Sequence, residues 1–456
     1  MPLDISDIGK EVLNTHYAVR GPIVARAKEL ERQGRKIIYC NIGNPQALGQ
    51  KPLSYVRQVL ALAQWPELLT LAPEAFPADA LARAKEILDK SGFGLGAYSD
   101  SKGVPFVREA VAAFIRSRDT DSSCAVASDP EHIYLTDGAS KAVQAVLRLL
   151  IAGPQDGIMT PIPQYPLYSA TITLYGGRQV GYFLDEASGW SLSKAMLEKA
   201  YLSAQEKGIR VRAICVINPG NPTGSVLSRD NIAMVIQFAK EHGLSILADE
   251  VYQENIYRPE DRFVSFARVL TELGEKVLSL FSFHSCSKGY LGECGQRGGY
   301  VEARNVSPEV LAQLTKLQSV SLCANLTGQV LVYLMVRPPH AGEASRETFL
   351  RERTAILGEL GERARLLAEG LSKIPGISCQ PVAGAMYAFP CIRLPQGRTD
   401  EDYCMALLEA TGICVVPGMG FGQEEGTAHF RTTILPPREQ MEEVVDKIKD
   451  FHASWI

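Results

Sequence analysis

Apolar and polar positions follow two alternating patterns in the middle of the chain. Between residues 132 and 302, short apolar runs rich in β-branched residues alternate with longer amphipathic segments such as Asn231–His242. Unbroken apolar runs such as Ala213–Ile217 are typical of strands buried on both faces of a parallel sheet. The alternation predicts an α/β fold with a largely parallel sheet and helices on both of its faces.

Helical patterns dominate after residue 305. The segment Arg346–Gly376 carries Ile356, Leu360, Ala364, Leu367 and Leu371 on one helical face, and Pro375 and Gly376 mark its end. Short apolar segments within 377–435 are consistent with strands. This part of the chain therefore indicates a second, smaller α+β unit. Near the beginning, we expect a helix over 21–34 and a strand that runs into a Gly-Asn-Pro turn over 36–46.

Composition excludes several classes of function. The chain has 456 residues, of which 46% are hydrophobic and 21% charged, and its formal net charge is −4. This charge gives no reason to expect a nucleic-acid or membrane partner. Ten cysteines occur singly, without a C-x-x-C pair, and no apolar run reaches transmembrane length. With the acidic first residues, these features predict reduced thiols and a cytoplasmic location.

Polar residues follow several of the predicted strands directly. Lys288 comes just after the apolar run 277–283, Asp249 ends another run, and Asn221 lies in the turn Asn221-Pro222-Thr223-Gly224. Ligands of open α/β sheets bind outside the carboxyl ends of the strands, so these side chains are candidates for one site. Taken singly, each residue also has a structural explanation: a surface lysine, a solvated carboxylate or a turn residue.

Two glycine-rich turns differ in what they predict. The turn from Asp137 to Ser140 leads from a strand into a helix, where free backbone N–H groups suit a phosphate. Its structural alternative is an ordinary connection capped by Asp137 or Ser140. The segment GFGLGAYSDSKG (92–103) follows a helix and has Ala97 where a dinucleotide fingerprint needs glycine. It therefore argues against nicotinamide binding and favours a loop that presents Tyr98.

Together and in this order, these motifs resemble the fold type I pyridoxal-phosphate aminotransferases, and among them most resemble the alanine aminotransferases. The resemblance covers nearly the whole chain. It rests on NIGNPQALGQKPLSYVRQVLAL (41–62), YSDSKG, LTDGAS, INPGNPTG, ADEVYQEN, FHSCSKGYLGECGQRGGYVE and FRTTIL. It implies a large cofactor-binding domain at 76–325, and a small domain built from both chain termini, with the segments 1–75 and 326–456.

The resemblance also implies roles around pyridoxal 5'-phosphate, which acts as an electron sink. Lys288 would form a Schiff base with this cofactor and, once freed, carry a proton. Asp249 would pair with the pyridine nitrogen. Tyr252 and Asn221 would donate to the phenolic oxygen. Tyr165 would stack on the ring, although a hydrophobic turn anchor is the alternative for this residue.

The resemblance assigns further residues to binding the cofactor phosphate and the substrate. The phosphate would be bound by Gly138, Ala139, Ser140, Ser285 and Arg297, and by Tyr98 from the other subunit of a homodimer. Arg431 would bind the substrate α-carboxylate in a bidentate pair. Gly43 and Asn221 would line the part of the site that holds this carboxylate. No motif identifies the cation for a second carboxylate, and Arg20 is our candidate.

The implied reaction is a ping-pong transamination between L-alanine and 2-oxoglutarate, giving pyruvate and L-glutamate. Glutamate:glyoxylate or another amino-acid transamination is a close alternative. A carbon–sulfur β-lyase on the same scaffold is a second alternative. An inactive regulatory scaffold is a third, but the joint presence of Lys288, Asp249, Arg297 and Arg431 argues against it. No metal site is expected.

Overall fold

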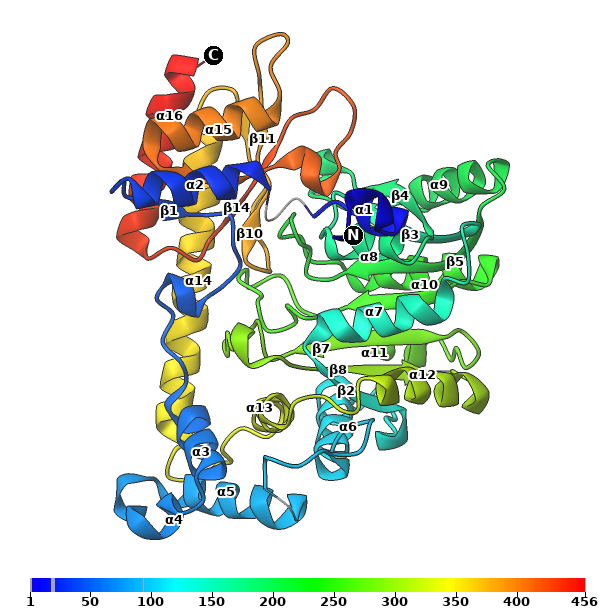
Figure 1. Cartoon of the computed structure of the whole chain (residues 1–456), viewed down its shortest axis with the longest axis vertical. Helices are drawn as coiled ribbons and strands as arrows, with labels where there is room; N and C mark the ends of the chain where they lie inside the picture. The colour runs from blue at the N-terminus through cyan, green and yellow to red at the C-terminus, as the bar shows by residue number, and fades with distance from the viewer. Residues whose placement is uncertain (1, 18–20, 93, 456) are drawn as a thin grey trace.

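The computed structural model describes residues 2–17, 21–92 and 94–455. Its largest sheet has seven strands in the order β2-β8-β7-β6-β5-β3-β4 (Figure 1). Strand β8 runs antiparallel to both of its neighbours, and the other pairs are parallel. The strands span Ile133–Asp137 (β2), Asp156–Ile162 (β3), Arg178–Phe183 (β4), Arg210–Ile217 (β5), Ser245–Asp249 (β6), Leu280–Ser285 (β7) and Gly298–Arg304 (β8). The predicted mostly parallel sheet is confirmed.

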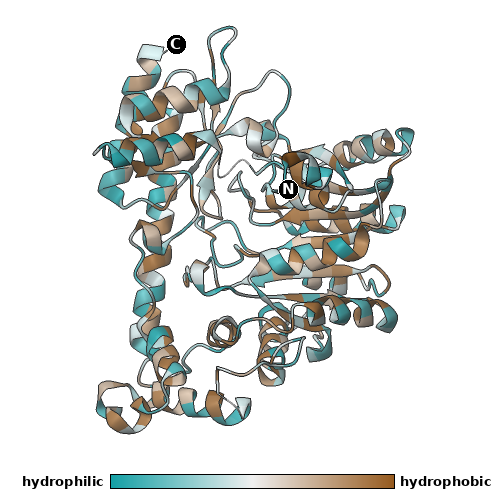
Figure 2. Cartoon of the chain, in the orientation of Figure 1, coloured by the Kyte–Doolittle hydropathy of each residue, from teal (hydrophilic) through white to brown (hydrophobic). Residues whose placement is uncertain are grey.

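Helices cover both faces of this sheet, as the alternating pattern predicts. Cys215 on β5 packs toward one set of helices, whereas Ile214 and Val216 pack toward the other. Figure 2 shows the strands mostly in the brown of hydrophobic residues. The first face is covered by α7 (Ala139–Leu150), α8 (Leu167–Leu174) and α12 (Pro308–Val320), and the second by α9 (Lys194–Glu206), α10 (Arg229–His242) and α11 (Phe266–Glu272).

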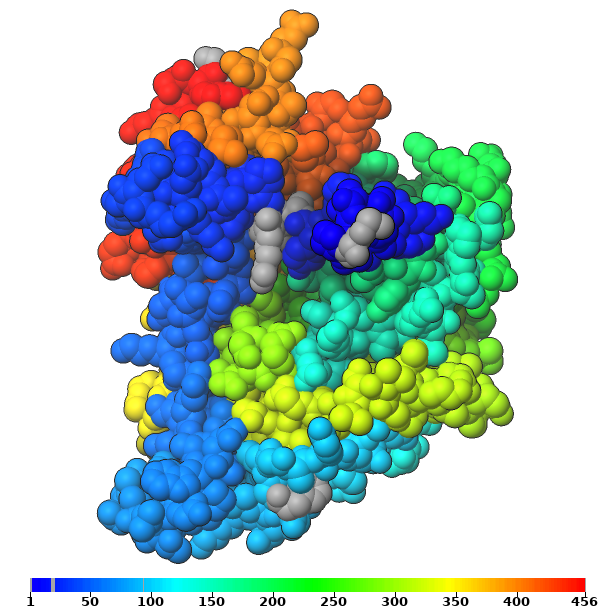
Figure 3. Space-filling model, viewed as in Figure 1, coloured from blue at the N-terminus to red at the C-terminus, as the bar shows by residue number. Residues whose placement is uncertain are grey.

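A third group of helices packs beside β2 and β8. It forms its own core with Leu135 and Tyr300. The core contains buried residues of α3 (Ser54–Gln64), α5 (Ala78–Ser91), α6 (Pro105–Asp119) and α13 (Leu326–Val336). The short α1 (Lys10–Leu13) lies on the surface against α8, and α4 (Leu68–Leu71) follows α3 (Figures 1 and 3).

Segments from both ends of the chain form the smaller unit, as predicted. Strand β1 (Ile38–Tyr39) pairs in parallel with β12 (Ile413–Cys414). A three-stranded sheet has the order β10-β14-β13, and β9 pairs with β11. These strands are β9 (Ile377–Ser378), β10 (Tyr387–Ala388), β11 (Cys391–Ile392), β13 (Val416–Pro417) and β14 (Phe430–Thr433). The helices are α2 (Pro22–Arg32), α14 (Arg346–Ser372), α15 (Asp400–Thr411) and α16 (Arg438–Trp455).

The long helix α14 runs along most of the long axis of the molecule, from α15 at the top of Figure 1 to α3 near the bottom. Near its beginning Phe349 packs in the core of α3 and α5, and near its end Leu371 packs with α16. Leu360, Ala364, Leu367 and Leu371 are buried as the periodicity predicts, whereas Ile356 is only half-buried. The domain limits 1–75, 76–325 and 326–456 stay a prediction.

Two strand predictions are wrong in their extent. The predicted strand over 36–46 is reduced to the two residues of β1, because only these face β12. The apolar run from Val277 enters its strand at Leu280. The backbone N–H groups of Val277 and Leu278 instead donate to the Glu275 carboxylate in a turn, which leaves Val277 84% exposed. Among the described helices, none is long and apolar enough to cross a membrane.

The contact between Gly412 and the segment before β1 gives a prediction about stability. Gly412 ends α15 with φ +78°, and a Cβ there would lie 2.5 Å from the carbonyl oxygen of Lys36. Gly397 has nearly the same φ, +79°, with open space around it. We expect Gly397→Ala to cost about 1–2 kcal/mol of backbone strain. Gly412→Ala should cost at least about 1 kcal/mol more, because it also displaces β1. Thermal unfolding of both variants measures this difference, and equal unfolding temperatures would contradict it.

Candidate active site

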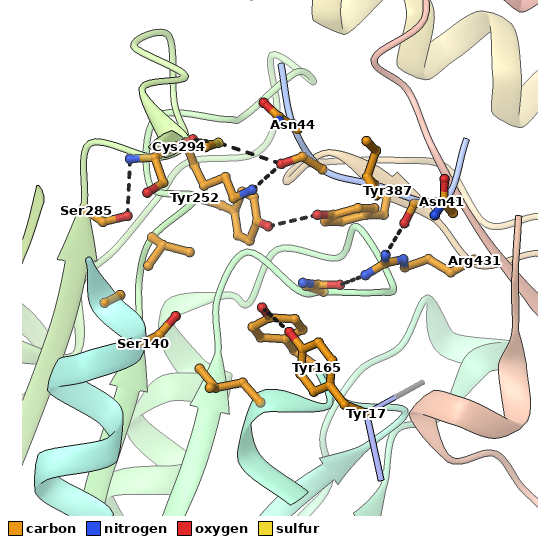
Figure 4. Close-up of a pocket in the computed structure, with 18 of the residues that line it drawn as sticks. Tyr17, Asn41, Asn44, Ser140, Tyr165, Tyr252, Ser285, Cys294, Tyr387 and Arg431 are labelled. Atoms are coloured by element: carbon orange, nitrogen blue, oxygen red, sulfur yellow. Dashed lines mark hydrogen bonds between the residues drawn. The ribbon is translucent and has the colours of Figure 1, made fainter. Parts of the chain in front are cut away.

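A cavity of about 1000 Å³ lies at the carboxyl ends of β5, β6 and β7 (Figure 4). Its walls come from both parts of the protein, since Asn41 and Arg431 belong to the smaller unit. Most of the predicted site residues line it: Gly43, Ala139, Ser140, Tyr165, Asn221, Asp249, Tyr252, Ser285, Lys288, Arg297 and Arg431. Gly138 lies directly beside it, beneath Arg297. The structure therefore brings these residues together, as expected for strand ends of one sheet.

The roles predicted for two residues are not tested by the structure. Tyr98 lies on the surface of the protomer with 75% of the residue exposed. Its predicted reach into another subunit stays a prediction. Arg20 lies outside the described residues, so its predicted role also stays a prediction.

Asp249 provides a buried negative charge on the cavity floor. It is 5% exposed at the end of β6, and the Tyr168 hydroxyl donates to its Oδ2 at 2.9 Å. Burial raises its pKa to about 6, against the opposing effects of Tyr168, the backbone of Val251 and the Lys288 charge. No salt bridge to Asp249 exists among the described residues. The neighbouring Glu250 is turned away, because its Oε1 accepts from the Phe266 backbone.

Lys288 lies in the loop three residues beyond β7. Its Nζ donates to the carbonyl oxygen of Gly43 and lies 6.0 Å from the centroid of the Tyr252 ring. A Cβ at residue 43 would lie 1.8 Å from the Tyr387 hydroxyl and 3.2 Å from Nζ. Glycine at this position therefore lets the N-terminal segment close over the lysine.

The start of α7 forms a cradle of hydrogen-bond donors. Arg297 donates from Nη2 to the carbonyl oxygen of Asp137 at 3.0 Å and from Nη1 to that of Cys294 at 2.9 Å. A Cβ at Gly138 would lie 2.3 Å from Nη2, so only glycine admits the guanidinium here. No side chain caps the helix, because the Asp137 carboxylate accepts from Asn325 instead. The uncapped helix start, the guanidinium and the hydroxyls of Ser140 and Ser285 suit an anion.

Arg431 is a buried cation whose contacts are neutral. It is 1% exposed, and it donates to the Asn41 carbonyl at 2.6 Å and to the Asn221 Oδ1 at 3.3 Å. Its Nε and the side-chain amide of Asn41 have no hydrogen-bond partner among the described residues. A buried charge without a counter-charge is costly. This arrangement suits a ligand that brings a carboxylate.

Two tyrosines of the cavity escaped prediction because no motif surrounds them. The Tyr387 ring lies 4.3 Å from the guanidinium carbon of Arg431, and its hydroxyl is 3.5 Å from that of Tyr252. Burial acts to raise the pKa of Tyr387, but the charges of Lys288 and Arg431 outweigh it and lower the pKa. The Tyr17 hydroxyl lies 2.9 Å from that of Tyr165. Only the fold brings these distant residues into one site.

Comparisons with known proteins agree with this geometry. The family "Aminotransferase class I and II" matches residues 67–448. The probable mitochondrial alanine aminotransferase of Dictyostelium discoideum is 50% identical, over 100% of this chain and 89% of its own length. Glutamate–glyoxylate aminotransferase 1 of Arabidopsis thaliana is also 50% identical, over 100% and 96%. The solved alanine aminotransferase of Pyrococcus furiosus has a TM-score of 0.80 at 26% identity, over 98% and 100%.

The chain therefore belongs to the class I and II aminotransferases, a family that depends on pyridoxal phosphate. The cavity residues fit this cofactor. The cradle at Gly138 suits its phosphate, the unpaired carboxylate of Asp249 suits a cationic ring nitrogen, and Lys288 lines the same cavity.

The burial of Asp249 gives a prediction about the cofactor-free protein. Its pKa is raised on folding, so folding favours the protonated form, and stability falls as pH rises from about 4 to above 6. The shift corresponds to at most about 3 kcal/mol. Asp249→Asn keeps the Tyr168 contact and removes the charge. We expect the cofactor-free variant to unfold at a higher temperature than the wild type at pH 7.5, with a smaller difference at pH 4.5. A variant that is less stable at both pH values would contradict this prediction.

Proposed function

We propose that the protein transfers the amino group of L-alanine to 2-oxoglutarate, giving pyruvate and L-glutamate, by a ping-pong reaction. Arg431, a buried cation with an unpaired Nε in the same cavity as Lys288, carries the proposal. Amino acids and 2-oxo acids share an α-carboxylate, so one arginine serves both halves of the exchange. The alanine aminotransferase names of several relatives support this substrate pair.

Each cavity residue has a proposed role in binding. When bound, pyridoxal phosphate supplies an electron sink for the reaction. Arg297, Ser285 and the start of α7 at Gly138, Ala139 and Ser140 hold its phosphate. Asp249 holds the ring nitrogen protonated, because an unpaired buried carboxylate attracts a cation. Tyr165 stacks on the ring, and Asn221 and Tyr252 donate to the phenolic oxygen.

Lys288 holds the cofactor covalently and moves the proton. Its Nζ already lies within hydrogen-bond distance of the Gly43 carbonyl, which orients the amine toward the cavity. Once freed, Nζ would act as the base that takes the proton from the substrate α-carbon, and it would carry that proton within the site. Arg431 fixes the α-carboxylate in a bidentate pair, and the Gly43 backbone lines the same end.

The second carboxylate of 2-oxoglutarate needs another cation. Among the described residues that line the cavity, four are Lys or Arg: Lys28, Lys288, Arg297 and Arg431. The last three have proposed roles, which leaves Lys28 on α2, an exposed residue at the mouth of the cavity. We assign the distal carboxylate to Lys28, with Arg20 as the earlier candidate outside the described residues.

The assembly and location are further parts of the proposal. A homodimer in which Tyr98 reaches the partner's cofactor phosphate accounts for a tyrosine that is exposed on one protomer. The cytoplasmic location stays a prediction, and the Dictyostelium relative is named as mitochondrial. A second candidate reaction uses glyoxylate as the acceptor, because two Arabidopsis glutamate–glyoxylate aminotransferases are 48–50% identical to this chain.

The absorption spectrum of the cofactor-loaded enzyme tests the reaction. We expect L-alanine alone to remove the visible band of the lysine-bound cofactor, and 2-oxoglutarate to restore it. Lys288→Ala should bind the cofactor without forming this band. Restoration by glyoxylate but not by 2-oxoglutarate would select the second candidate. A band that does not respond to L-alanine would refute the substrate proposal.

A Lys28→Gln variant tests the distal contact. We expect KM for 2-oxoglutarate to rise by up to about 5-fold, because an exposed charge pair contributes at most about 1 kcal/mol. KM for L-alanine, which has no distal carboxylate, should be unchanged. Lys51→Gln is the matched control, since Lys51 is exposed and does not line the cavity. Equal effects on both substrates would remove Lys28 from this role.

A further inference from the structure

A second cavity, of about 410 Å³, lies between the edge strand β4 and the smaller unit. Glu186, Trp190, Phe389, Gln423 and His429 line it, and it shares no lining residue with the active site. Nothing in the proposed reaction uses these side chains. Two of them are a buried histidine and a carboxylate, and the thiol of Cys391 lies close to both.

The three side chains converge from separate segments of the chain. The imidazole of His429, the Sγ of Cys391 and the carboxylate of Glu186 offer ligand atoms that all lie within 4.8 Å of one another. Cys391 and His429 form an antiparallel backbone bridge, which holds their side chains as direct cross-strand neighbours. Glu186 comes from the short 3-10 helix Glu186–Ser188 that follows β4.

A hydrogen bond and a ring stack fix the orientation of the His429 imidazole. Gln423 donates from Nε2 to the buried carboxylate of Asp400 at 3.0 Å, so its Oε1 must accept from the His429 Nδ1–H at 3.0 Å. The ring also stacks on Phe389 at 4.8 Å between centroids. Nε2 therefore faces Glu186, 2.9 Å away. Histidine ligands of metals are held in this way, with the second ring nitrogen donating to an oxygen.

We propose that Glu186, Cys391 and His429 form a Zn²⁺ site. Zinc binds carboxylate oxygen, thiolate sulfur and imidazole nitrogen at about 2.0–2.3 Å, which in a tetrahedron places the ligand atoms roughly 3.5 Å apart. The present spacing needs only small side-chain movements to reach that geometry. The fourth position faces the cavity, where water completes the tetrahedron.

A proton is the competitor of the metal at this site. The imidazole and the thiol bind a metal only in their deprotonated forms. Zinc must displace the proton on Nε2 and the proton of the Cys391 thiol. Binding therefore releases up to two protons and becomes tighter as pH rises.

The place of the site suggests what the metal does. Glu186 follows the edge of the large sheet, whereas Cys391 and His429 belong to the smaller unit. Phe389 contacts both His429 and Phe421, and Phe421 lies 4.6 Å from the guanidinium carbon of Arg431. A bound metal would join the two parts on the side of the molecule that supports Arg431. We expect it to raise the unfolding temperature of the holoenzyme.

Cobalt provides a direct test because Co²⁺ bound to a thiolate gives a strong near-ultraviolet charge-transfer band. The cofactor-loaded enzyme is treated with chelator and titrated with Co²⁺ at pH 8, and the protein-bound zinc is measured separately by elemental analysis. We expect one equivalent of either metal per chain, a thiolate band with Co²⁺, and weaker binding at pH 6.

Conservative variants separate this site from other thiols. Cys391→Ser should abolish the thiolate band, and His429→Gln and Glu186→Gln should each weaken zinc binding at least 10-fold, because losing even an outer-shell partner of a metal ligand typically costs 10- to 100-fold. Cys323→Ser and His242→Asn are the controls. Cys323 is half-buried elsewhere, and His242 belongs to a surface group in which Lys194 already pairs with Glu241.

Circular dichroism of every variant without metal verifies folding. A wild type with no stoichiometric binding at pH 8 would overturn the proposal. A thiolate band that survives Cys391→Ser would overturn it as well, because another cysteine would then be the ligand. A higher unfolding temperature with zinc in the wild type but not in Cys391→Ser would support it.

Discussion

The site depends on two buried charges that have no oppositely charged partner within residues 2–17, 21–92 and 94–455. Asp249 lies on the floor of the cavity with a tyrosine hydroxyl as its main partner, and Arg431 lies on the opposite wall with neutral oxygens. Each such charge costs several kcal/mol relative to water. In the proposed reaction, a cationic ring and a carboxylate would recover this cost on entering the cavity. The two unpaired charges would then act as binding sites for the cofactor and the substrate.

The fold makes this arrangement possible by assembling the cavity from parts with separate cores. The strand ends of the seven-stranded sheet supply Asp249 and lead into the loop of Lys288, whereas β14 supplies Arg431. The N-terminal segment crosses between them, and the carbonyl groups of Asn41 and Gly43 contact Arg431 and Lys288 respectively. Glycine at 43 is required because the Tyr387 hydroxyl occupies the space of a side chain. Two backbone carbonyls thus position two of the proposed functional cations.

Most of this site could be predicted because its residues lie in local patterns. Asp249 and Lys288 follow apolar runs, and Gly138 lies in a strand-to-helix turn, so sequence alone places them at one edge of a sheet. Arg431 came from a resemblance to a family and not from a local pattern. Tyr17, Tyr387 and the group around His429 have no local signal, because their partners lie far away in sequence. The strand expected at Val277 was wrong for a local reason, since the Glu275 carboxylate holds that backbone in a turn.

Tyr387 connects the two ends of the proposed reaction. Its ring lies against the guanidinium of Arg431, and its hydroxyl lies toward Tyr252 in the same cavity as Lys288. The positive charges of Lys288 and Arg431 lower its pKa, so its hydroxyl is a better hydrogen-bond donor than an ordinary buried tyrosine. A carboxylate bound to Arg431 would cancel part of that positive charge. In the proposed reaction, substrate binding at Arg431 would therefore change the electrostatic environment of Lys288, the lysine proposed to move the proton.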